Sequence, residues 1–406
     1  MQAPVARVGV VGMGLVSPLG NEVGTAWQRL VDGDSAVASS GGGMELPVAA
    51  ASFDIAPVLG KLQQVGTERV SQMALLAARQ ALADAAGETW ADPERVGLFV
   101  GTGMGGASTI DQGYAALHAG GRIPPLTVPA GMANGAAAVI ALHTGIRGPA
   151  ITYAVACASS AVAIAEAAHA LRRGEVDLAI AGGAEALLVP GAVAAWQALR
   201  TLAPAREDDV GRSCRPFARD RSGLVLGEGA AFLVLERQDD IDRRGRAPRA
   251  WLAGSAVRCD ALHLTNPAVR GQAAAMRAAI AASGLVPADI GYCNAHGTAT
   301  VAGDPVECEA LRQVWQHAAP KLAVSSTKAA HGHLLGAAGA LEAVWTIQAL
   351  RTGDLPPTQG LADLDPACDG LDHVRQPGTR APALRHAISN SFAFGGTNAV
   401  LVFSKA

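Results

Sequence analysis

The chain has 406 residues and a formal net charge of −3, and half of its residues are apolar. A chain of that length is longer than a domain with a single hydrophobic core usually is, so we expect two domains or one large duplicated unit. No acidic or basic block interrupts the sequence, which argues against a nucleic-acid-binding surface and against a basic membrane-binding patch.

The six cysteines form no CxxC pair and have no metal-ligand spacing with the ten histidines. Reduced thiols of this kind are typical of a cytoplasmic protein, and we expect no metal site. The apolar stretch at 129–146 contains Asn134, His143 and several glycines, so it is too polar for a transmembrane helix. The sequence therefore predicts a soluble protein without a membrane anchor.

The first part of the chain alternates apolar strands with helices of small residues. Strands are expected at 7–12, 96–100, 151–156, 178–181 and 230–235, and helices at 22–32, 70–86, 130–142 and 158–173. Gly12 and Gly14 lack the third glycine of a dinucleotide-binding loop, so no nucleotide site is expected. The glycine-rich turn at 101–106 is interpreted as a place of close packing. A strand, an almost wholly apolar helix and another strand over 151–181 indicate a parallel sheet.

The charged segment at 236–249 is the strongest change of composition in the chain. It predicts a boundary between one half at 1–249 and another at 250–406. The same alternation resumes in the second half, with strands at 250–257, 289–294, 322–325, 386–391 and 398–403 and helices at 271–283, 304–316 and 334–351. The similar order of elements indicates a structural duplication.

Cys157 lies between the apolar run at 151–156 and the helix at 158–173. A tight strand-to-helix turn would place its sulfur near the unpaired N–H groups of a helix N-terminus. That environment lowers the pKa of a thiol and favours a thiolate. A single buried cysteine is more often a core residue, so the choice depends on the rest of the chain.

Three further turns also follow short apolar strands. They lie at 294–300, 325–333 and 390–398. The first two carry His296, Lys328 and His333. One histidine alone is more often a hydrogen-bonded structural residue. The carboxyl ends of neighbouring parallel strands, however, are where ligands and catalytic groups collect, so these turns and Cys157 are expected to share one pocket.

These motifs resemble the β-ketoacyl-[acyl-carrier-protein] synthases of the elongating type II kind, which belong to the thiolase superfamily. The resemblance spans nearly the whole chain. It is carried by Cys157 in Ala-Cys-Ala-Ser, the block from His296 through Thr298 and Thr300 to Asp304 and Glu307, Lys328 with His333, Gly336 to Gly339 with Glu342, Arg215-Pro216-Phe217, Gly227-Glu228-Gly229, and the final Asn-Ser-Phe-x-Phe-Gly-Gly-Thr-Asn. It implies an α/β, thiolase-like, duplicated five-layer αβαβα fold with two mixed sheets around buried helices.

The resemblance also implies the chemistry. Cys157 would take an acyl group from a thioester, and malonyl-carrier would lose CO2 to give an enolate that attacks the acyl carbonyl. His296 and His333 would donate hydrogen bonds to the enolate oxygen from Nε2, and backbone N–H groups of Cys157 and Phe394 would form the oxyanion hole. Lys328, held by Glu342, would set the field around His333.

Other residues receive roles by the same resemblance. Asp304, Glu307 and Glu342 would support the site, Thr298 and Thr300 would contact the pantetheine arm, and Phe392, Phe394 and Trp196 would line the substrate pocket. No dissociable cofactor and no metal are implied, because acyl groups arrive on the phosphopantetheine of an acyl carrier protein. The expected assembly is a dimer, formed with an identical or a related subunit through a strand of the first half.

The sequence departs from the family pattern at a few positions. Ala393 stands where the family usually has glycine, and Ala218 and Ser222 stand where it usually has aspartate. If residue 393 needs a positive φ, alanine would stiffen or shift a loop that gates acyl entry. Trp196 replaces a smaller aromatic residue and would reshape the bound chain. These departures favour specialised metabolism over primary fatty-acid elongation.

Several related activities compete with this interpretation. A biosynthetic thiolase would use a second cysteine as base, where this chain has His333. A non-catalytic chain-length partner would lack the nucleophile, but Cys157 is present. An acyltransferase that does not decarboxylate stays open, as does the catalytic subunit of a ketosynthase/chain-length-factor heterodimer.

Overall fold

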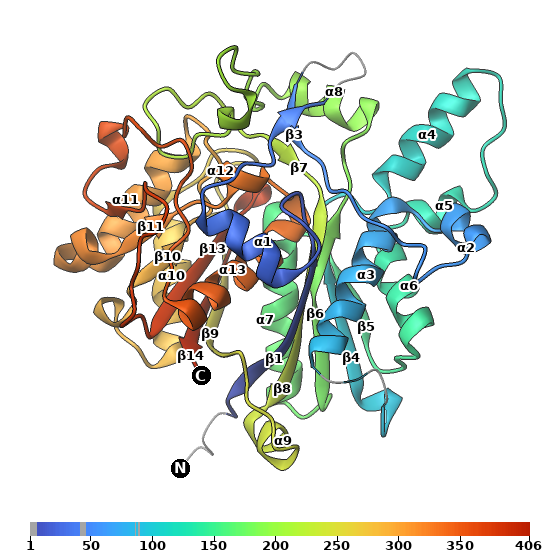
Figure 1. The fold of residues 1–406 in the computed structure, drawn as a ribbon, viewed down its shortest axis with the longest axis horizontal. Coiled ribbons are helices and arrows are strands. Elements are labelled where there is room, and N and C mark those ends of the chain that lie inside the picture. The colour runs from blue at the N-terminus through green and yellow to red at the C-terminus, as the bar shows by residue number, and fades with distance from the viewer. Residues whose placement is uncertain (1–5, 41–45, 86, 88–89) are drawn as a thin grey trace.

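The computed structural model of the protein describes residues 6–40, 46–85, 87 and 90–406. Their main feature is a continuous sheet of eleven strands, accompanied by a small sheet of three (Figure 1). The large sheet comprises β1 Val8–Val16, β4 Val96–Gly101, β5 Ala150–Tyr153, β6 Leu178–Glu185, β8 Gly229–Arg237, β9 Ala250–Cys259, β10 Tyr292–Asn294, β11 Ala323–Ser325, β12 Asp372–His373, β13 His386–Phe392 and β14 Thr397–Lys405. The small sheet comprises β2 Ala38–Ser39, β3 Pro47–Ala49 and β7 Leu226–Gly227.

The large sheet consists of two halves with the same topology. In space the first half runs β5-β4-β6-β8-β1 and the second β11-β10-β13-β14-β9, so each has the chain order third, second, fourth, fifth, first. In each half the first two neighbouring pairs are parallel and the last two antiparallel. Only β12, a two-residue strand at the edge, has no counterpart. The duplication expected from the order of elements is therefore present.

A short antiparallel pairing between β1 and β9 joins the halves. It covers three residue pairs, from Val8 with Leu252 to Val10 with Ala250. Beyond that seam the two five-stranded arrays are held together by the helices between them. The expected division of the chain at residues 249 and 250 stays a prediction.

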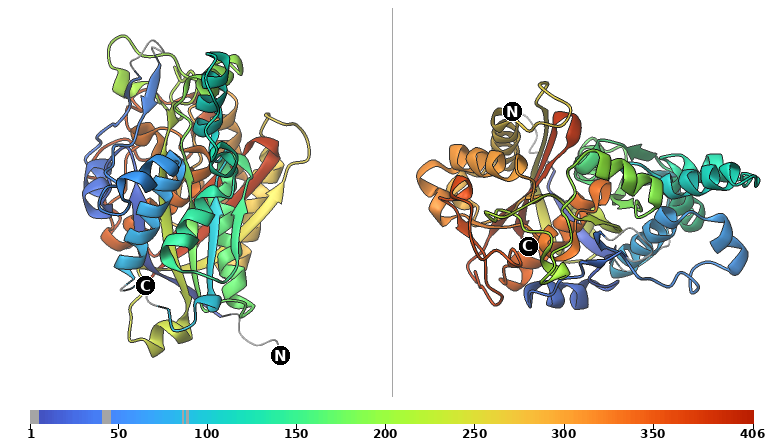
Figure 2. Two further views of the ribbon diagram at one scale, coloured as in Figure 1. Left: turned by 90° about the vertical axis from the view of Figure 1, so that its right-hand side faces the viewer. Right: turned by 90° about the horizontal axis from the view of Figure 1, so that it is seen from above.

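The helices form the remaining layers. They are α1 Val23–Val31, α2 Lys61–Gly66, α3 Arg69–Asp84, α4 Ala107–His118, α5 Thr127–Gly131, α6 Gly135–Thr144, α7 Ser159–Arg172, α8 Pro190–Ala198, α9 Gln238–Arg243, α10 Val269–Ser283, α11 Gly303–Trp315, α12 Lys328–His331 and α13 Ala338–Thr352. Helices α7 and α13 pack on each other and on strands of both halves, whereas α3 and α10 cover the outer faces (Figures 1 and 2). The result is the expected α-β-α-β-α layering.

The composition of the two central helices explains their place. Every residue of α13 from Ala338 to Leu350 is buried, and α7 is buried over most of its length. A helix that is apolar nearly all round has no face for water and must lie between two layers. On the outer face, Gly12 and Gly14 of β1 let α3 approach, because a Cβ at either would lie 2.2 Å from a carbonyl oxygen of that helix.

Several predicted elements differ from the structure in extent. The strand expected at 151–156 ends at Tyr153, because the chain turns there into a 3-10 helix, η2 Ala156–Ala158. The helix expected at 130–142 is two helices, α5 and α6, and the one at 334–351 begins with η6 Leu335–Ala337. Helix α3 ends at Asp84, and residue 86 of the expected helix lies outside the described residues. Helices α4 and α8 were not predicted.

Candidate active site

Cys157 occupies the middle of η2, directly before α7. Ala156 begins the turn with a φ of +48°, in the left-handed region that residues with a side chain rarely adopt. Ser159 holds the turn: its Oγ accepts from the Val155 N–H at 2.9 Å and donates to the Ala156 carbonyl at 2.7 Å. The strain is thus offset by local hydrogen bonds, and the turn places the sulfur at the end of a pocket.

Burial and nearby groups act on the pKa of Cys157 in opposite directions. Burial raises the pKa of Cys157 to about 12, although Lys328 and the backbone N–H of Phe394 act in the opposite direction. Burial therefore acts against the expected thiolate, because desolvation disfavours the charged form of the sulfur. The backbone N–H groups of Phe394 and Cys157 both act on the sulfur and favour its charged form.

The two histidines meet the cysteine from the other half of the molecule. His333 Nε2 lies 3.0 Å from Cys157 Sγ, and the rings of His296 and His333 are 5.4 Å apart in an edge-on arrangement. A ligating atom of each of the three residues lies within 4.8 Å of the others. The sequence prediction that these residues share a pocket is confirmed.

Hydrogen bonds fix which nitrogen of each ring carries the proton. The Leu335 N–H donates to His333 Nδ1 at 3.3 Å, and Lys328 Nζ lies 3.4 Å from His296 Nδ1. Because each Nδ1 accepts, the proton of each neutral ring is on Nε2. Burial lowers the pKa of both histidines well below the ordinary value for histidine, and the positive charge of Lys328 lowers it further. Both imidazoles are therefore neutral. Both rings therefore present N–H donors, not metal-binding lone pairs, to the pocket.

Lys328 and Glu342 form an ion pair that is wholly buried. The carboxylate on α13 holds the Lys328 ammonium, which contacts His296, whereas the expectation from sequence named His333. Burial raises the pKa of Glu342 to about 7, and the attraction of Lys328 acts against that rise. The pair thus keeps a cation behind the two histidines, where it disfavours their protonation.

Two other predicted carboxylates act at a distance from the sulfur. Glu307 accepts from the N–H groups of His296 at 2.8 Å and Gly297 at 2.7 Å, and from the Asn390 side chain at 3.0 Å. Asp304 accepts from the Phe217 N–H at 2.8 Å. Glu307 therefore fixes the His296 turn directly.

The residues predicted to bind substrate line one pocket. Its lining includes Cys157, His296, His333, Thr298, Thr300, Phe392, Phe394 and Trp196. The Trp196 and Phe394 rings stack at 6.0 Å between centroids. Lys328 and Glu342 are absent from the lining.

The departure at Ala393 causes no backbone strain. Its φ of −112° and ψ of 153° are extended values that any residue adopts. The left-handed conformations of this loop fall on Gly395 and Gly396, both of which are glycine. The expected stiffening through a positive φ at 393 is therefore wrong, and nothing in the structure explains Ala218 and Ser222.

Sequence analysis missed one residue near the site, Glu185 at the end of β6. Its side chain is fully buried and accepts hydrogen bonds from the turn after β4 and from Gly336. The signal was present, because an acidic residue closes an apolar strand at the sheet edge where the catalytic turns meet.

The chain matches two family models, the β-ketoacyl synthase N-terminal domain over residues 5–241 and the C-terminal domain over 249–362. It is 37% identical to 3-oxoacyl-[acyl-carrier-protein] synthase 2 of Coxiella burnetii and 39% identical to nodulation protein E of Rhizobium sp. strain N33, each covering 98% of both chains. The solved ishigamide ketosynthase/chain length factor superposes with a TM-score of 0.92 at 30% identity, covering 99% of this chain and 100% of that one. The protein belongs to the β-ketoacyl synthase family.

Proposed function

We propose that the protein catalyses the decarboxylative condensation of an acyl thioester with malonyl-acyl-carrier protein. In the first step the Cys157 sulfur attacks the acyl thioester and the carrier thiol leaves, so the thiol proton of the enzyme passes to the departing carrier sulfur. The intermediate is an acyl thioester of Cys157. The observation that carries the proposal is a thiol 3.0 Å from a histidine Nε2 at the end of a substrate-sized pocket.

In the second step malonyl-carrier loses CO2 and becomes an enolate. Its oxygen accepts hydrogen bonds from the Nε2–H groups of His296 and His333. Both imidazoles stay neutral while the enolate oxygen becomes negative. The enolate carbon attacks the acyl carbonyl and the Cys157 sulfur leaves, taking up one proton to regain the resting thiol. The products are CO2 and a β-ketoacyl-carrier, in fatty-acid or type II polyketide biosynthesis.

Backbone donors would stabilise the tetrahedral intermediate of both steps. The N–H groups of Cys157 and Phe394 act on the sulfur, and we place the oxygen of an acyl group bound to that sulfur within their reach. Removing one such donor in comparable enzymes costs about 3 kcal/mol of transition-state stabilisation. Because Phe394 stacks on Trp196, the shape of the acyl pocket is coupled to this oxyanion hole.

The carrier arm would enter past Thr298 and Thr300, whose hydroxyls are 3.1 Å apart at the pocket wall. The proposed partner is an acyl carrier protein, the substrate in the printed name of the Coxiella relative. No dissociable cofactor is needed, since the substrates carry their own pantetheine. Within the described residues no helix is long and apolar enough to cross a membrane, and we propose a cytoplasmic location.

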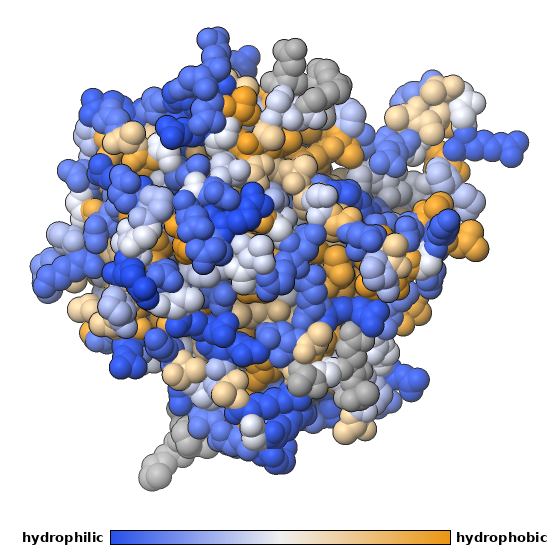
Figure 3. Space-filling model, viewed as in Figure 1, coloured by the Kyte–Doolittle hydropathy of each residue, from blue (hydrophilic) through white to orange (hydrophobic). Residues whose placement is uncertain are grey.

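The right-hand edge of the large sheet suggests the dimer surface. Strand β5 is an edge strand, and its Ile151 is 43% exposed. Apolar side chains of α4 and α5, including Tyr114 and Val128, are also exposed. Apolar surface appears over these helices at the right of the molecule (Figure 3). An unpaired apolar edge strand is suited to pairing with another subunit. The partner is either a second copy or a related subunit, as in the ishigamide ketosynthase/chain length factor.

One assay tests the proposed reaction. The purified protein is mixed with acyl-carrier and malonyl-carrier, and the mass of the intact enzyme, the release of CO2 and the ketoacyl product are measured. Acylated Cys157 with both products is expected. Acylation without CO2 would indicate the acyltransferase alternative, and absence of both acylation and product would contradict an enzymatic role.

A further inference from the structure

The geometry points to Glu185 as a positioning residue for this reaction: its carboxylate holds the His333 turn against the turn after β4 and so sets the distance from His333 to Cys157. This inference rests on the proposed condensation. Glu185 forms no hydrogen bond with the sulfur and does not line the pocket, although its charge contributes to raising the Cys157 pKa; its effect on geometry passes through the groups that it binds.

The carboxylate joins two turns from different halves of the chain. Oε2 accepts from the Gly103 N–H at 2.6 Å and the Gly336 N–H at 3.0 Å. Oε1 accepts from the Met104 N–H at 3.2 Å and the Thr102 hydroxyl at 3.3 Å. All four partners are neutral donors, so the buried carboxylate is satisfied by backbone and hydroxyl groups without a cation partner.

The link to His333 runs through two consecutive peptide units. Gly336 N–H binds Glu185, and the preceding Leu335 N–H donates to His333 Nδ1. Leu335 has a φ of +45°, a conformation that needs such fixed partners. If the Gly336 N–H loses its acceptor, the Leu335 N–H is free to turn away from the imidazole. His333 then loses both its orientation and the bond that keeps the proton on Nε2.

The other side of the carboxylate reaches the nucleophile turn. The Ser159 hydroxyl shares its one proton between the Ala156 carbonyl at 2.7 Å and the Thr102 carbonyl at 3.2 Å. The His333 turn and the turn after β4 are in direct contact, because a Cβ at Gly336 would lie 2.2 Å from the Gly103 nitrogen. Glu185 therefore lies between the supports of the thiol and of the imidazole, and a shift there changes the 3.0 Å separation of the reacting groups.

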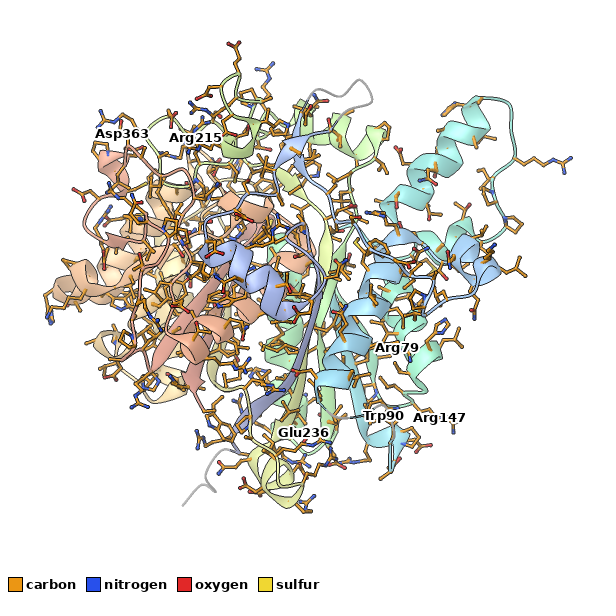
Figure 4. All side chains as sticks on the ribbon, viewed as in Figure 1. Arg79, Trp90, Arg147, Arg215, Glu236 and Asp363 are labelled. Atoms are coloured by element: carbon orange, nitrogen blue, oxygen red, sulfur yellow. The ribbon has the colours of Figure 1, made fainter. Side chains whose placement is uncertain are left out.

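The test compares Glu185→Gln with a matched control, Glu236→Gln. Glu236 is equally buried but lies at the far end of β8 beside α9, where it pairs with Arg244 and Arg246 (Figure 4). Both variants replace a buried carboxylate by an amide of the same shape. For each, thermal unfolding, acyl loading, kcat and KM for malonyl-carrier are measured.

Glu185→Gln is expected to lower kcat by about 10- to 100-fold with KM within two-fold, because misplacing a catalytic group by about 1 Å costs that much. The control is expected to keep kcat within two-fold of the wild type, whatever its loss of thermal stability. Glu185→Asp, which restores a shorter carboxylate, is expected to lie between Glu185→Gln and wild type.

Two results would overturn the inference. One is a folded Glu185→Gln enzyme with kcat within two-fold of wild type. The other is Glu185→Asp less active than Glu185→Gln, since that order would mean that side-chain volume matters and the carboxylate does not. If Glu185→Gln does not fold, Glu185→Asp alone tests the inference. We then expect a five-fold or larger loss of kcat at unchanged KM, and an unchanged kcat would contradict the inference. Inactive wild type would instead refute the proposed function.

Discussion

The turns that precede α7 and α13 have the same backbone and carry different side chains. Each is a short 3-10 helix that opens with a left-handed residue, Ala156 at φ +48° in one half and Leu335 at +45° in the other. The next position is Cys157 in the first turn and Gly336 in the second. The duplicated topology therefore supplies the strained turn, and the side chain at one position decides which copy becomes the nucleophile.

The surroundings of the two turns explain the difference. The second turn lies against the backbone of Gly103, so it has no room for a side chain at Gly336. The first turn opens into the substrate pocket, where the sulfur reaches His333. One copy has become a rigid support and the other a reactive centre.

Removing the Cys157 sulfur, the main difference between the two turns, is expected to have the largest effect on activity. Cys157→Ala makes the two turns nearly alike and is expected to abolish acyl loading completely, because no other described nucleophile lies at that position. The fold should be retained, since alanine fits the turn. Intact-mass analysis after incubation with acyl-carrier measures the loading, and Cys214→Ala, at another buried cysteine, is the control. Loading of the Cys157→Ala enzyme would contradict the assignment.

Removing the donor that faces the sulfur is expected to have the next largest effect. His333→Ala should lower the rate of condensation by about 100- to 1000-fold, as for the loss of one oxyanion-hole donor. Release of CO2 from malonyl-carrier measures this step. The exposed His118 offers the control His118→Ala, for which no change is expected. A His333→Ala enzyme that releases CO2 at the wild-type rate would rule out the donor role.

The ion pair behind the histidines is expected to affect stability. Lys328→Met leaves Glu342 as an unpaired buried carboxylate and should lower the free energy of unfolding by about 3–5 kcal/mol. Adding Glu342→Gln should recover part of that loss, whereas Lys321→Met at an exposed lysine should change little. Denaturant titration gives the values. A loss below about 1 kcal/mol would mean that Glu342 is protonated in the folded enzyme.

Glycine substitutions at the first position of each turn compare how much the left-handed conformation costs in stability. Ala156→Gly relieves the left-handed strain and is expected to raise the free energy of unfolding by up to about 1 kcal/mol. Leu335→Gly relieves the same strain but deletes a buried side chain, so it should lower stability by about 2 kcal/mol or more. Urea denaturation of both variants provides the test. Equal effects would show that the buried Leu335 side chain does not stabilise its turn.

The smallest effect is expected at the acyl pocket. Trp196→Phe keeps an aromatic ring against Phe394 but frees volume, so longer acyl chains should be accepted and the product distribution should shift. Mass spectrometry of the ketoacyl products over a series of acyl-carriers measures this. An unchanged distribution would mean that Trp196 does not limit the chain.

Much of the fold could be predicted because its signals are local. The apolar runs that became β4, β11 and β13 lie within two residues of their predicted positions. Helices α4 and α8 were missed; they pack on each other across a long stretch of sequence, and α4 also packs on α5, the next helix along the chain. The seam between β1 and β9 pairs residues far apart in sequence, which no local pattern records.

The site was predictable where chemistry and spacing coincide, as for Cys157, His296 and His333. The protonation state of Cys157 was not, because the desolvation that raises its pKa depends on how completely the second half covers it. Glu185 could be noticed in the sequence only as an acidic residue that closes an apolar strand; its partners, backbone N–H groups of two turns, could not be predicted.

The matched turns also bear on how such a site can arise. Two identical halves assembled as a symmetric pair would carry the same residue at positions 157 and 336, and both turns would need room for a thiol. Here one turn has room and the other has none. The asymmetry requires halves of unlike sequence, and joining both in one polypeptide guarantees that each molecule receives one of each kind. The peptide link between the halves thus fixes the stoichiometry of the reaction centre at one sulfur to two imidazoles.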